Sequence, residues 1–465
     1  MNYQGNKVEN LKISYIGGGS RGWAWNLMSD LAQEQSLSGT VYLYDIDEHA
    51  AKNNELIGNA IRKTHKEADN FTYLSTGDIK EALSGADFVI ISILPGTFDE
   101  MESDVHAPEK YGIYQSVGDT SGPGGIVRAL RTLPMFEEFA RAIKTYCPNA
   151  WVINYTNPMT MCMRMLYKIF PEIKAFGCCH EVFGTQKLLC RVLEDVAGIQ
   201  DVKRDEIKTN VVGINHFTWL TKANYRNMDL FPLYKDFCEK YRESGVPAEK
   251  SGDNNWANRF FASAEKVKID LFLRYGSIAA AGDRHLAEFC PGSWYLENPD
   301  MVEKWGFGLT PVSWRKENRK TLLQKSEDMA SGRTEFTICP SGEEGVRQMK
   351  AILGLGDLVT NVNPPNYGQI PNLPLGAVVE TNASFTSDSV TPVFAGNIPQ
   401  NIFGLMSRTV INQECVVEAA CQKSYEKAFP AFVNDALNTI GLHDAKALFN
   451  TMLENTKAYL SMYKS

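Results

Sequence analysis

The feature that most constrains the fold is a glycine-rich turn between a short apolar run and a helical pattern near the N-terminus. Residues 11–16 read Leu-Lys-Ile-Ser-Tyr-Ile, which is typical of a buried strand, and Gly17, Gly19 and Gly22 follow in the spacing G-x-G-x-x-G. Apolar residues then recur at helical spacing through residues 23–31. This order predicts the first strand, turn and helix of a dinucleotide-binding fold, in which a pyrophosphate rests on the helix N-terminus.

Further apolar runs alternate with helical stretches through the first part of the chain. Strand-like runs are found at residues 40–45, 71–75, 87–94 and 150–155. Strands that alternate with helices favour a parallel sheet covered by helices on both faces. The predicted fold class is therefore α/β, with a Rossmann-like, doubly wound parallel sheet.

The rhythm of the sequence changes after about residue 200. A strand-like run at 208–213 is followed by longer helical stretches, a loop rich in proline and asparagine at 362–374, and helical spacing over 410–465. We expect a dinucleotide-binding domain over residues 8–200 and a mixed α/β (α+β) domain over residues 201–465. The second domain would serve substrate and metal binding and oligomerisation, and the architecture would be like that of lactate and malate dehydrogenases.

The composition excludes several classes of protein. A net charge of −8 with no basic tract argues against a nucleic-acid-binding protein. No apolar run approaches the roughly 18–20 residues that cross a bilayer, and the N-terminus lacks the apolar core of a secretion signal. The 10 cysteines show no disulfide spacing. We expect a cytoplasmic protein with free thiols and with no nucleic-acid or membrane partner.

Polar residues follow the strands at positions where a dinucleotide would be bound. Asp45 ends the second strand, where an acid bonds the ribose hydroxyls and favours NAD over NADP, although Arg21 could weaken that preference. Asn154 and Asn157 could bond the nicotinamide ribose or sugar hydroxyls, and an Asn-Pro turn explains them equally well. The predicted cofactor-binding residues are Gly17, Gly19, Ser20, Arg21, Gly22, Asp45 and Asn154.

A thiol and an imidazole follow two other strand-like runs. Cys179 and His216 would suit a divalent metal such as Mn²⁺, Fe²⁺, Co²⁺ or Ni²⁺, with His180 as a further possible ligand. Both residues would then lie at the carboxyl edge of the sheet. A buried cysteine and a core histidine are the structural alternative.

Two further segments gather residues suited to proton transfer. The glycine-rich segment 118–125 contains one acid, Asp119, and segment 282–288 contains two acids, an arginine and a histidine. The second segment could equally be the start of a solvated helix with Asp283 as its cap. Tyr275 lies shortly before it and could act as a base if a cation lowers its pKa.

Taken in order, these motifs resemble glycoside hydrolase family 4 over nearly the whole chain. The resemblance implies NAD and a divalent metal, Mn²⁺ above the others, with Cys179 and His216 as metal ligands and a homodimer or homotetramer as the assembly. The run Cys179-His-Glu-Val182 is similar to that of the α-galacturonidases of the family. The motifs that carry the resemblance are the glycine turn and residues 118–125, 154–158, 179–182, 215–216 and 372–374.

The resemblance implies a glycosidase that cleaves α-galacturonides, such as those derived from pectin, without net redox change. The implied route is oxidation at C3 by NAD⁺, removal of the C2 proton, elimination of the leaving group and addition of water, with the metal as Lewis acid. Asp119 maps to an acid of the family. Asp283, which we prefer over Tyr275, maps to the region that supplies the base.

A uronic substrate needs a cation for its carboxylate, and the sequence does not rank the arginines that could supply one. Bidentate pairing with an arginine is the physical expectation. Arg128, Arg131 and Arg284 are the candidates. Because the Glu181 carboxylate would repel that group, it is expected to bond a hydroxyl or an arginine instead. The predicted substrate-facing residues are Asn157, His180, Glu181, Arg128, Arg284 and His285.

Other functions stay open at this point. An α-glucuronidase or an α-galactosidase would share the family and most of its motifs. A plain NAD-dependent 2-hydroxy-acid dehydrogenase would share the first domain but would need no metal, so Cys179 with His216 is the feature that discriminates. In a non-catalytic NAD sensor, Cys179 and Asp283 would be dispensable.

Overall fold

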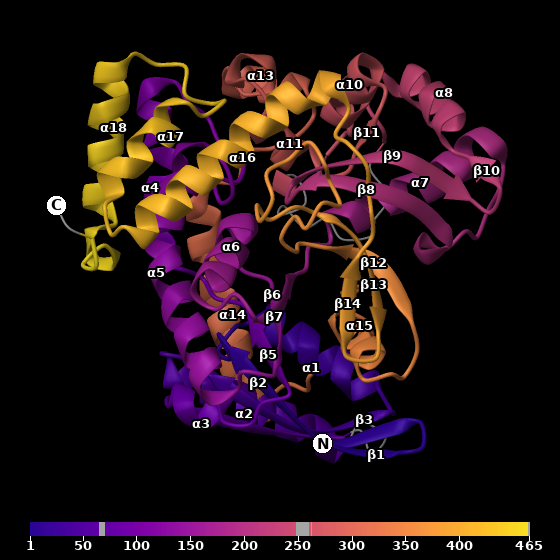
Figure 1. Cartoon of the computed structure of the whole chain (residues 1–465), viewed down its shortest axis with the longest axis vertical. Helices are drawn as coiled ribbons and strands as arrows, with labels where there is room; N and C mark the ends of the chain where they lie inside the picture. Colours follow the sequence, from indigo (N-terminus) through magenta and orange to yellow (C-terminus); the bar gives the residue numbers. More distant parts are fainter. Residues whose placement is uncertain (65–69, 248–259, 262, 464–465) are drawn as a thin grey trace.

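The predicted doubly wound sheet forms the lower half of the molecule in Figure 1. The computed structural model describes residues 1–64, 70–247, 260–261 and 263–463. Within these residues the first sheet has seven strands. Six are parallel and lie in the order β4-β3-β2-β5-β6-β7, and β1 pairs with β2 in the antiparallel direction. The parallel strands wind outward from the first one in both directions, which is the order of dinucleotide-binding domains. The fold class predicted from the sequence is confirmed.

The strands and helices of this half follow one another along the chain as expected from the apolar runs. The strands are β1 (Asn2–Gln4), β2 (Lys7–Ile16), β3 (Leu37–Tyr44), β4 (Phe71–Thr76), β5 (Phe88–Ile91), β6 (Trp151–Asn154) and β7 (Lys174–Gly177). The helices are α1 (Trp23–Gln33), α2 (Glu48–Thr64), α3 (Ile79–Leu83), α4 (Phe98–His106), α5 (Gly122–Tyr146), α6 (Met159–Ile169) and α7 (Glu181–Ala197).

Each central strand is apolar on both faces because both faces of the sheet are covered. Along β5, Val89 and Ile91 belong to the core formed with α5 and α6, whereas Phe88 and Ile90 belong to the core on the side of α1. Successive side chains of a strand point to opposite faces, so a strand buried on both sides reads as a continuous apolar run. This explains why the sequence pattern located these strands.

Four parallel strands end in register at one edge of the sheet. Ile16 is paired with Ile91, and Ile91 is paired with Asn154. Asn154 is in turn paired with Gly177. The glycine turn and the segments that follow β5, β6 and β7 therefore leave the sheet along one line, and in open α/β sheets this edge is where ligands bind.

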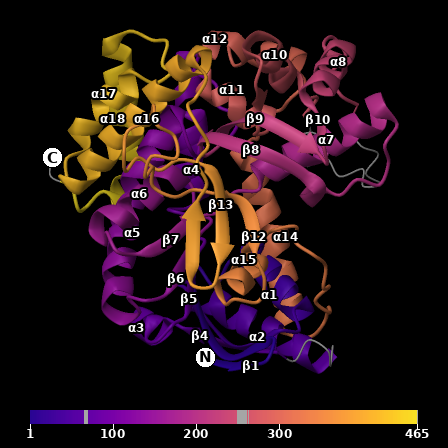
Figure 2. The same cartoon turned by 45° about the vertical axis from the view of Figure 1, so that its right-hand side comes forward.

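The rest of the chain builds two small antiparallel sheets and a set of helices above and beside the first sheet (Figures 1 and 2). The strands are β8 (Ile207–Ile214), β9 (Phe217–Tyr225), β10 (Met228–Asp229), β11 (Ile278–Ala279), β12 (Leu358–Val362), β13 (Thr381–Thr386) and β14 (Ser389–Pro392). The helices are α8 (Phe231–Tyr241), α10 (Lys266–Tyr275), α11 (Asp283–Phe289), α12 (Gly292–Tyr295), α13 (Pro299–Lys304), α14 (Val312–Ala330), α15 (Gly345–Ile352), α16 (Gln400–Cys421), α17 (Phe429–Val433) and α18 (Leu442–Asn455).

The two parts of the chain share their hydrophobic cores. Met349 of α15 and Phe385 of β13 pack in the same core as β2, β3 and α1. Val416 of α16 packs in the core that lies between the first sheet, α5 and α6. The second part therefore closes over the carboxyl edge of the sheet instead of standing apart from it. None of the described helices is long and apolar enough to span a bilayer.

Candidate functional site

The glycine turn joins β2 to α1 and passes very close to two neighbouring segments. Gly17 has a φ of 94°, and a Cβ atom there would lie 2.0 Å from the carbonyl oxygen of Ser92. A Cβ atom at Gly19 would lie 2.9 Å from Asp45 Oδ2. Both positions therefore require glycine, as the turn of a dinucleotide site does.

Two polar side chains hold the turn in this shape. The N–H of Gly19 donates to Asp45 Oδ2 at 2.8 Å. Asn54 Nδ2 donates to the carbonyl oxygens of Gly18 and Ser20, at 2.7 and 3.0 Å. Asp45 thus lies beside the turn, where the sequence placed it. Asn54 stands in no motif, so its role could not be predicted from the sequence.

Arg21 and Gly22 lead into the N-terminus of α1. Arg21 Nε is buried without a hydrogen-bond partner, and Nη2 lies 3.8 Å from Asp47 Oδ2. Gly22 is the N-cap of α1 and offers no side chain to the first turn of the helix. An unpartnered guanidinium nitrogen beside an open helix N-terminus fits the anionic groups of a dinucleotide.

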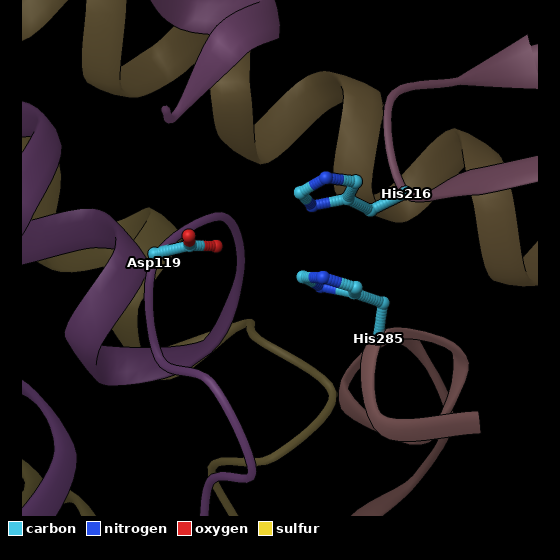
Figure 3. Close-up of side chains that lie close together, drawn as sticks. All are labelled: Asp119, His216 and His285. Carbon is cyan, nitrogen blue, oxygen red and sulfur yellow. The ribbon is translucent and has the colours of Figure 1, made fainter. Parts of the chain in front are cut away.

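Three side chains from distant parts of the sequence converge above this edge (Figure 3). Asp119 comes from the loop before α5, His216 from the turn between β8 and β9, and His285 from α11, and all three point toward one another. One ligand atom of each lies within 4.8 Å of the other two. The two imidazole rings are 3.7 Å apart between centroids. This is a donor set of a carboxylate and two imidazoles, which suits divalent transition metals.

His216 has an uncommon backbone conformation. It follows Asn215 in the two-residue turn that joins Ile214 of β8 to Phe217 of β9. Its φ is 64°, in the left-handed region that few residues other than glycine adopt. Such conformations are concentrated at functional sites because they position a side chain at a cost in local energy. Here the turn aims His216 at Asp119.

Thr120 links the carboxylate to the imidazole. Its hydroxyl lies 2.7 Å from Asp119 Oδ1 and 2.9 Å from His216 Nδ1. A hydroxyl has one proton, so donation to the carboxylate leaves it to accept from His216 Nδ1–H. That tautomer keeps the lone pair of His216 on Nε2, as a metal ligand requires. The sequence analysis missed Thr120, and its only signal was its place next to Asp119.

The protonation states of Asp119 and His216 fit a metal site. Burial and the neighbouring His285 lower the pKa of His216 to about 3, so its ring is neutral. Burial opposes ionisation of Asp119, but His216, His285 and Arg128 together outweigh it and hold its pKa below the usual range. His285 Nδ1 is buried and has no partner. Because buried polar atoms are almost always bonded, this atom has room for a ligand that would complete it.

Cys179 lies at the end of β7, outside this group of three. Burial raises the pKa of its thiol well above the usual range. Asn361 Nδ2 donates both to the carbonyl oxygen of Cys179 and to Glu380 Oε1, at 3.2 and 2.7 Å. Asn215 Nδ2 lies 3.4 Å from Glu380 Oε2. Glu380, which the sequence analysis did not identify, therefore ties the segment of Cys179 to the turn that carries His216.

His180 and Glu181 point in different directions. His180 lies on the side of the nucleotide turn, where its ring is 6.1 Å from that of Trp23 and its Nδ1 is 3.0 Å from Glu343 Oε1. Glu181 Oε2 accepts from Gly282 N at 2.6 Å, and Oε1 lies 3.7 Å from His285 Nε2. Glu181 thus borders the Asp119–His216–His285 group, and His180 does not.

Asp283 lies apart from this group although it precedes Arg284 and His285. Its side chain is fully buried and accepts from the backbone N–H groups of Val267 and Lys268, at 3.2 and 3.0 Å. Burial and the nearby Glu265 raise its pKa above the usual range. These contacts make it a cap for the start of α10, whereas the structural alternative from the sequence had Asp283 as the solvated cap of its own helix.

Tyr275 at the end of α10 is also remote from the Asp119–His216–His285 group. Its ring packs edge-on against Trp219, 5.9 Å between centroids. Burial raises its pKa, and the charges that act on it are those of Cys290, Arg274 and Asp270. The structure thus brings neither residue predicted as a base into contact with Asp119.

The two asparagines after β6 have different partners. Asn154 is fully buried, donates to the carbonyl oxygen of Thr156 and accepts from its N–H, so its amide is occupied by a turn. Asn157 Nδ2 donates to Asp119 Oδ2 at 3.3 Å, and its Oδ1 is buried without a partner. Asn157 therefore borders the site, whereas Asn154 shapes the segment that carries it.

The three arginines that were candidates for binding the substrate carboxylate have different partners within the protein. Arg131 is fully buried and forms an ion pair with Asp104. Arg128 Nε donates to the carbonyl oxygen of Asn157 at 3.2 Å, and its Nη1 is enclosed without a partner. Arg284 donates to the carbonyl oxygen of Ser116 at 2.8 Å.

The loop that carries Asp119 is fixed by Glu288 at the end of α11. Glu288 Oε1 accepts from the N–H groups of Val117 and Gly118, at 2.7 and 2.9 Å. Burial raises the pKa of Glu288 to about 7. The second acid of segment 282–288 thus acts on the position of Asp119.

Comparison with known proteins assigns the chain to a family. Residues 12–195 match the family 4 glycosyl hydrolase model, and residues 211–438 match the family 4 glycosyl hydrolase C-terminal domain. An alpha-galacturonidase of Thermoanaerobacterium saccharolyticum is 63% identical over 464 residues, which cover 100% of this chain and 99% of that protein. An alpha-galacturonidase of Bacillus subtilis is 53% identical, with 96% of this chain and 98% of that protein covered.

Solved structures agree with this assignment. The crystal structure of lplD from Bacillus subtilis superposes with a TM-score of 0.91 at 53% identity, covering 96% of this chain and 100% of that one. A 6-phospho-alpha-glucosidase from gut microorganisms, solved with NAD and Mn²⁺, has the same fold, with a TM-score of 0.81 at 21% identity and 98% of this chain covered. From these matches, which run through both parts of the chain, it follows that the protein belongs to glycoside hydrolase family 4.

Proposed function

We infer that the protein is an α-galacturonidase that uses NAD and a divalent metal, Mn²⁺ in the first place. The observation that carries this inference is the identity of 63% over the whole chain to an alpha-galacturonidase. The glycine turn with Asp45, and the group of Asp119, His216 and His285 at the same edge of the sheet, support the two cofactors. A 2-hydroxy-acid dehydrogenase would use an Asp–His pair but would need no metal.

The residues present could hold both cofactors. The glycine turn, Arg21 and Asp45 would hold the dinucleotide, and Asp119, His216 and His285 would hold the metal, with Cys179 as a further ligand once its thiol is deprotonated. When bound, NAD⁺ supplies a hydride acceptor for the sugar C3–H, and the metal supplies a Lewis acid for the oxygens at C2 and C3.

The chain's own groups would orient the sugar and move its protons. Asp119 is held ionised, so it can bind a cation or accept a proton but is not suited to donate one. Burial raises the pKa of Glu181 less than His285 and His216 lower it, and the net pKa is about 2, so this carboxylate is ionised as well. Both can therefore accept hydrogen bonds from sugar hydroxyls or take up the proton that leaves C2.

Asp283 and Tyr275 are not part of this proposed machinery. The carboxyl of Asp283 is occupied by two backbone N–H groups, and Tyr275 packs on Trp219.

We also propose that the enzyme works in the cytoplasm as a homodimer or homotetramer on a small sugar-acid substrate. All 10 cysteines are free thiols, which fits a reducing compartment. Gel filtration with light scattering would measure the assembly.

Hydrolysis of p-nitrophenyl α-D-galacturonide tests the function. We expect nitrophenol release that requires both NAD⁺ and Mn²⁺, slower release from substrate deuterated at C2, and little release from the matching α-glucuronide and α-galactoside. Hydrolysis that survives removal of both cofactors would contradict the elimination route. Faster turnover of the glucuronide or the galactoside would transfer the assignment to that sugar.

A further inference from the structure

We propose that Arg315, with Arg284 beside it, forms the subsite that binds the carboxylate of the uronic sugar. The proposal rests on the proposed function and names the residues that would make this enzyme prefer a uronide over a neutral sugar. The sequence analysis did not consider Arg315, because nothing in its neighbourhood has the form of a motif.

The guanidinium of Arg315 has no polar partner among the described residues. It lies in the first turns of α14, is half-buried, and forms no hydrogen bond or ion pair with any described residue. A cation near a helix N-terminus is also opposed by the helix dipole. α14 has no acid in its first turn that would offset that charge. A free, accessible guanidinium in such a place is suited to an anionic ligand.

Arg315 lies next to Arg284. The guanidinium carbons of the two residues lie 5.9 and 4.8 Å from the centroid of the same ring, that of Phe261. Neither arginine forms an ion pair with a carboxylate of the described residues. Two adjacent guanidinium groups repel each other, and an anion between them would relieve that repulsion.

Arg284 connects this pair of arginines to the Asp119–His216–His285 group. Arg284 is the residue before His285, and its Nη2 donates to the carbonyl oxygen of Ser116 in the loop that carries Asp119. Its Nε donates to the carbonyl oxygen of Gly308, shortly before α14. Arg284 thus bridges the loop of Asp119 and the segment that leads to Arg315.

Charge effects agree with this geometry. Burial, and then the charge of Arg315, lower the pKa of Arg284 to about 10. Burial also lowers the pKa of Arg315, and the charge of Asp119 opposes that change. The two guanidinium groups and the carboxylate of Asp119 therefore lie within electrostatic reach of one another.

The other arginines of the sequence analysis are less suitable. Arg131 already pairs with Asp104 inside the protein. Arg128 is buried, and its Nε already donates to the carbonyl oxygen of Asn157. The hydrogen bonds of Arg284 go to two carbonyl oxygens and to Thr310, which fixes its position and leaves Arg315 as the group with all its donors free.

The test compares two substrates that differ only at C6, p-nitrophenyl α-D-galacturonide and p-nitrophenyl α-D-galactoside, in the holoenzyme. We expect Arg315→Gln to lower kcat/KM for the galacturonide by about 10- to 100-fold, the loss of a charged hydrogen bond, and to leave the galactoside rate unchanged. Arg315→Lys should recover part of the loss, because lysine keeps the positive charge but cannot form the two parallel hydrogen bonds of a guanidinium. The matched control is Arg319→Gln, which removes the same charge from the exposed next turn of α14 and should change neither rate.

A binding measurement separates this proposal from the proposed function. Calorimetry with D-galacturonate and with D-galactose should show that Arg315→Gln weakens only the acid by about 10-fold or more. Equal losses for both substrates, or unchanged galacturonate affinity, would overturn the role of Arg315. If the unaltered enzyme binds galacturonate through Arg315 but does not cleave the galacturonide, the proposed function fails and the subsite stands.

Discussion

Asp283 and His285 lie two residues apart on α11, and both have buried polar atoms, but they are bonded very differently. The carboxyl of Asp283 accepts two backbone N–H groups at the start of α10, and the nearby Lys268 pairs with Glu265 at 2.6 Å. His285 Nδ1 has no partner, and the His285 side chain points toward Asp119 and His216 (Figure 3). A bonded group stabilises the fold by itself, whereas an unbonded one costs free energy until a ligand completes it. This difference in hydrogen bonding separates the structural cluster around Asp283 from the candidate metal site that contains His285.

The largest expected effect tests the Asp119–His216–His285 group, to which the unbonded His285 belongs. We expect His216→Ala to lower kcat/KM by about 1000-fold, because it removes a ligand from the metal and a partner from Thr120. Titration of Mn²⁺ followed by electron paramagnetic resonance should show the same variant losing metal affinity, while urea unfolding of the apoprotein changes little. A variant that keeps full Mn²⁺ affinity would show that the group is not the metal site.

The second-largest expected effect tests Asp283, whose carboxyl is fully bonded. We expect Asp283→Ala to lower the free energy of unfolding by about 3 kcal/mol, because it leaves two buried N–H groups at the start of α10 without an acceptor. The measurement is urea unfolding without added cofactors. Mn²⁺ affinity of the folded fraction should stay within a factor of about two, well below the effect of losing a ligand or its support. A stable variant with no turnover would instead return Asp283 to the chemistry as the base at C2.

A smaller effect tests how the site is preorganised. We expect Thr120→Val to weaken Mn²⁺ binding by about 10-fold, because the hydroxyl that fixes the tautomer of His216 is lost. Thr132→Val is the matched control, since Thr132 is also buried but bonds only the carbonyl oxygen of Arg128 within α5. Equal affinities of the two variants would mean that Thr120 does not position His216.

Local patterns predicted those parts of the molecule that depend on local structure. The strands β5 and β6 are apolar runs, and Gly17 and Gly19 in the turn after β2 have steric requirements that only glycine meets. Asp45 could be placed because it ends a strand next to that turn. These features need only the period of a strand and the geometry of one turn.

The residues that the sequence analysis missed or misplaced depend on contacts across the chain. Asp283 stands in a dense polar segment, but a helix start turns consecutive side chains to different sides, so Asp283 faces α10 while His285 faces Asp119. Sequence spacing does not show which side is bonded. Arg315 could not be selected either, because its proposed role depends on its forming no hydrogen bond or ion pair with the described residues.

The smallest expected effect concerns His180, which borders the nucleotide turn and not the Asp119–His216–His285 group. Its hydrogen bond to Glu343 raises its pKa, so this pair adds stability below about pH 6.5 and loses it as pH rises through the raised value. The side chain is 53% exposed, so we expect His180→Gln to cost only about 0.5 kcal/mol at pH 6 and nothing at pH 9, measured by urea unfolding without cofactors. A loss that persists at pH 9 would instead point to packing of the ring on Trp23.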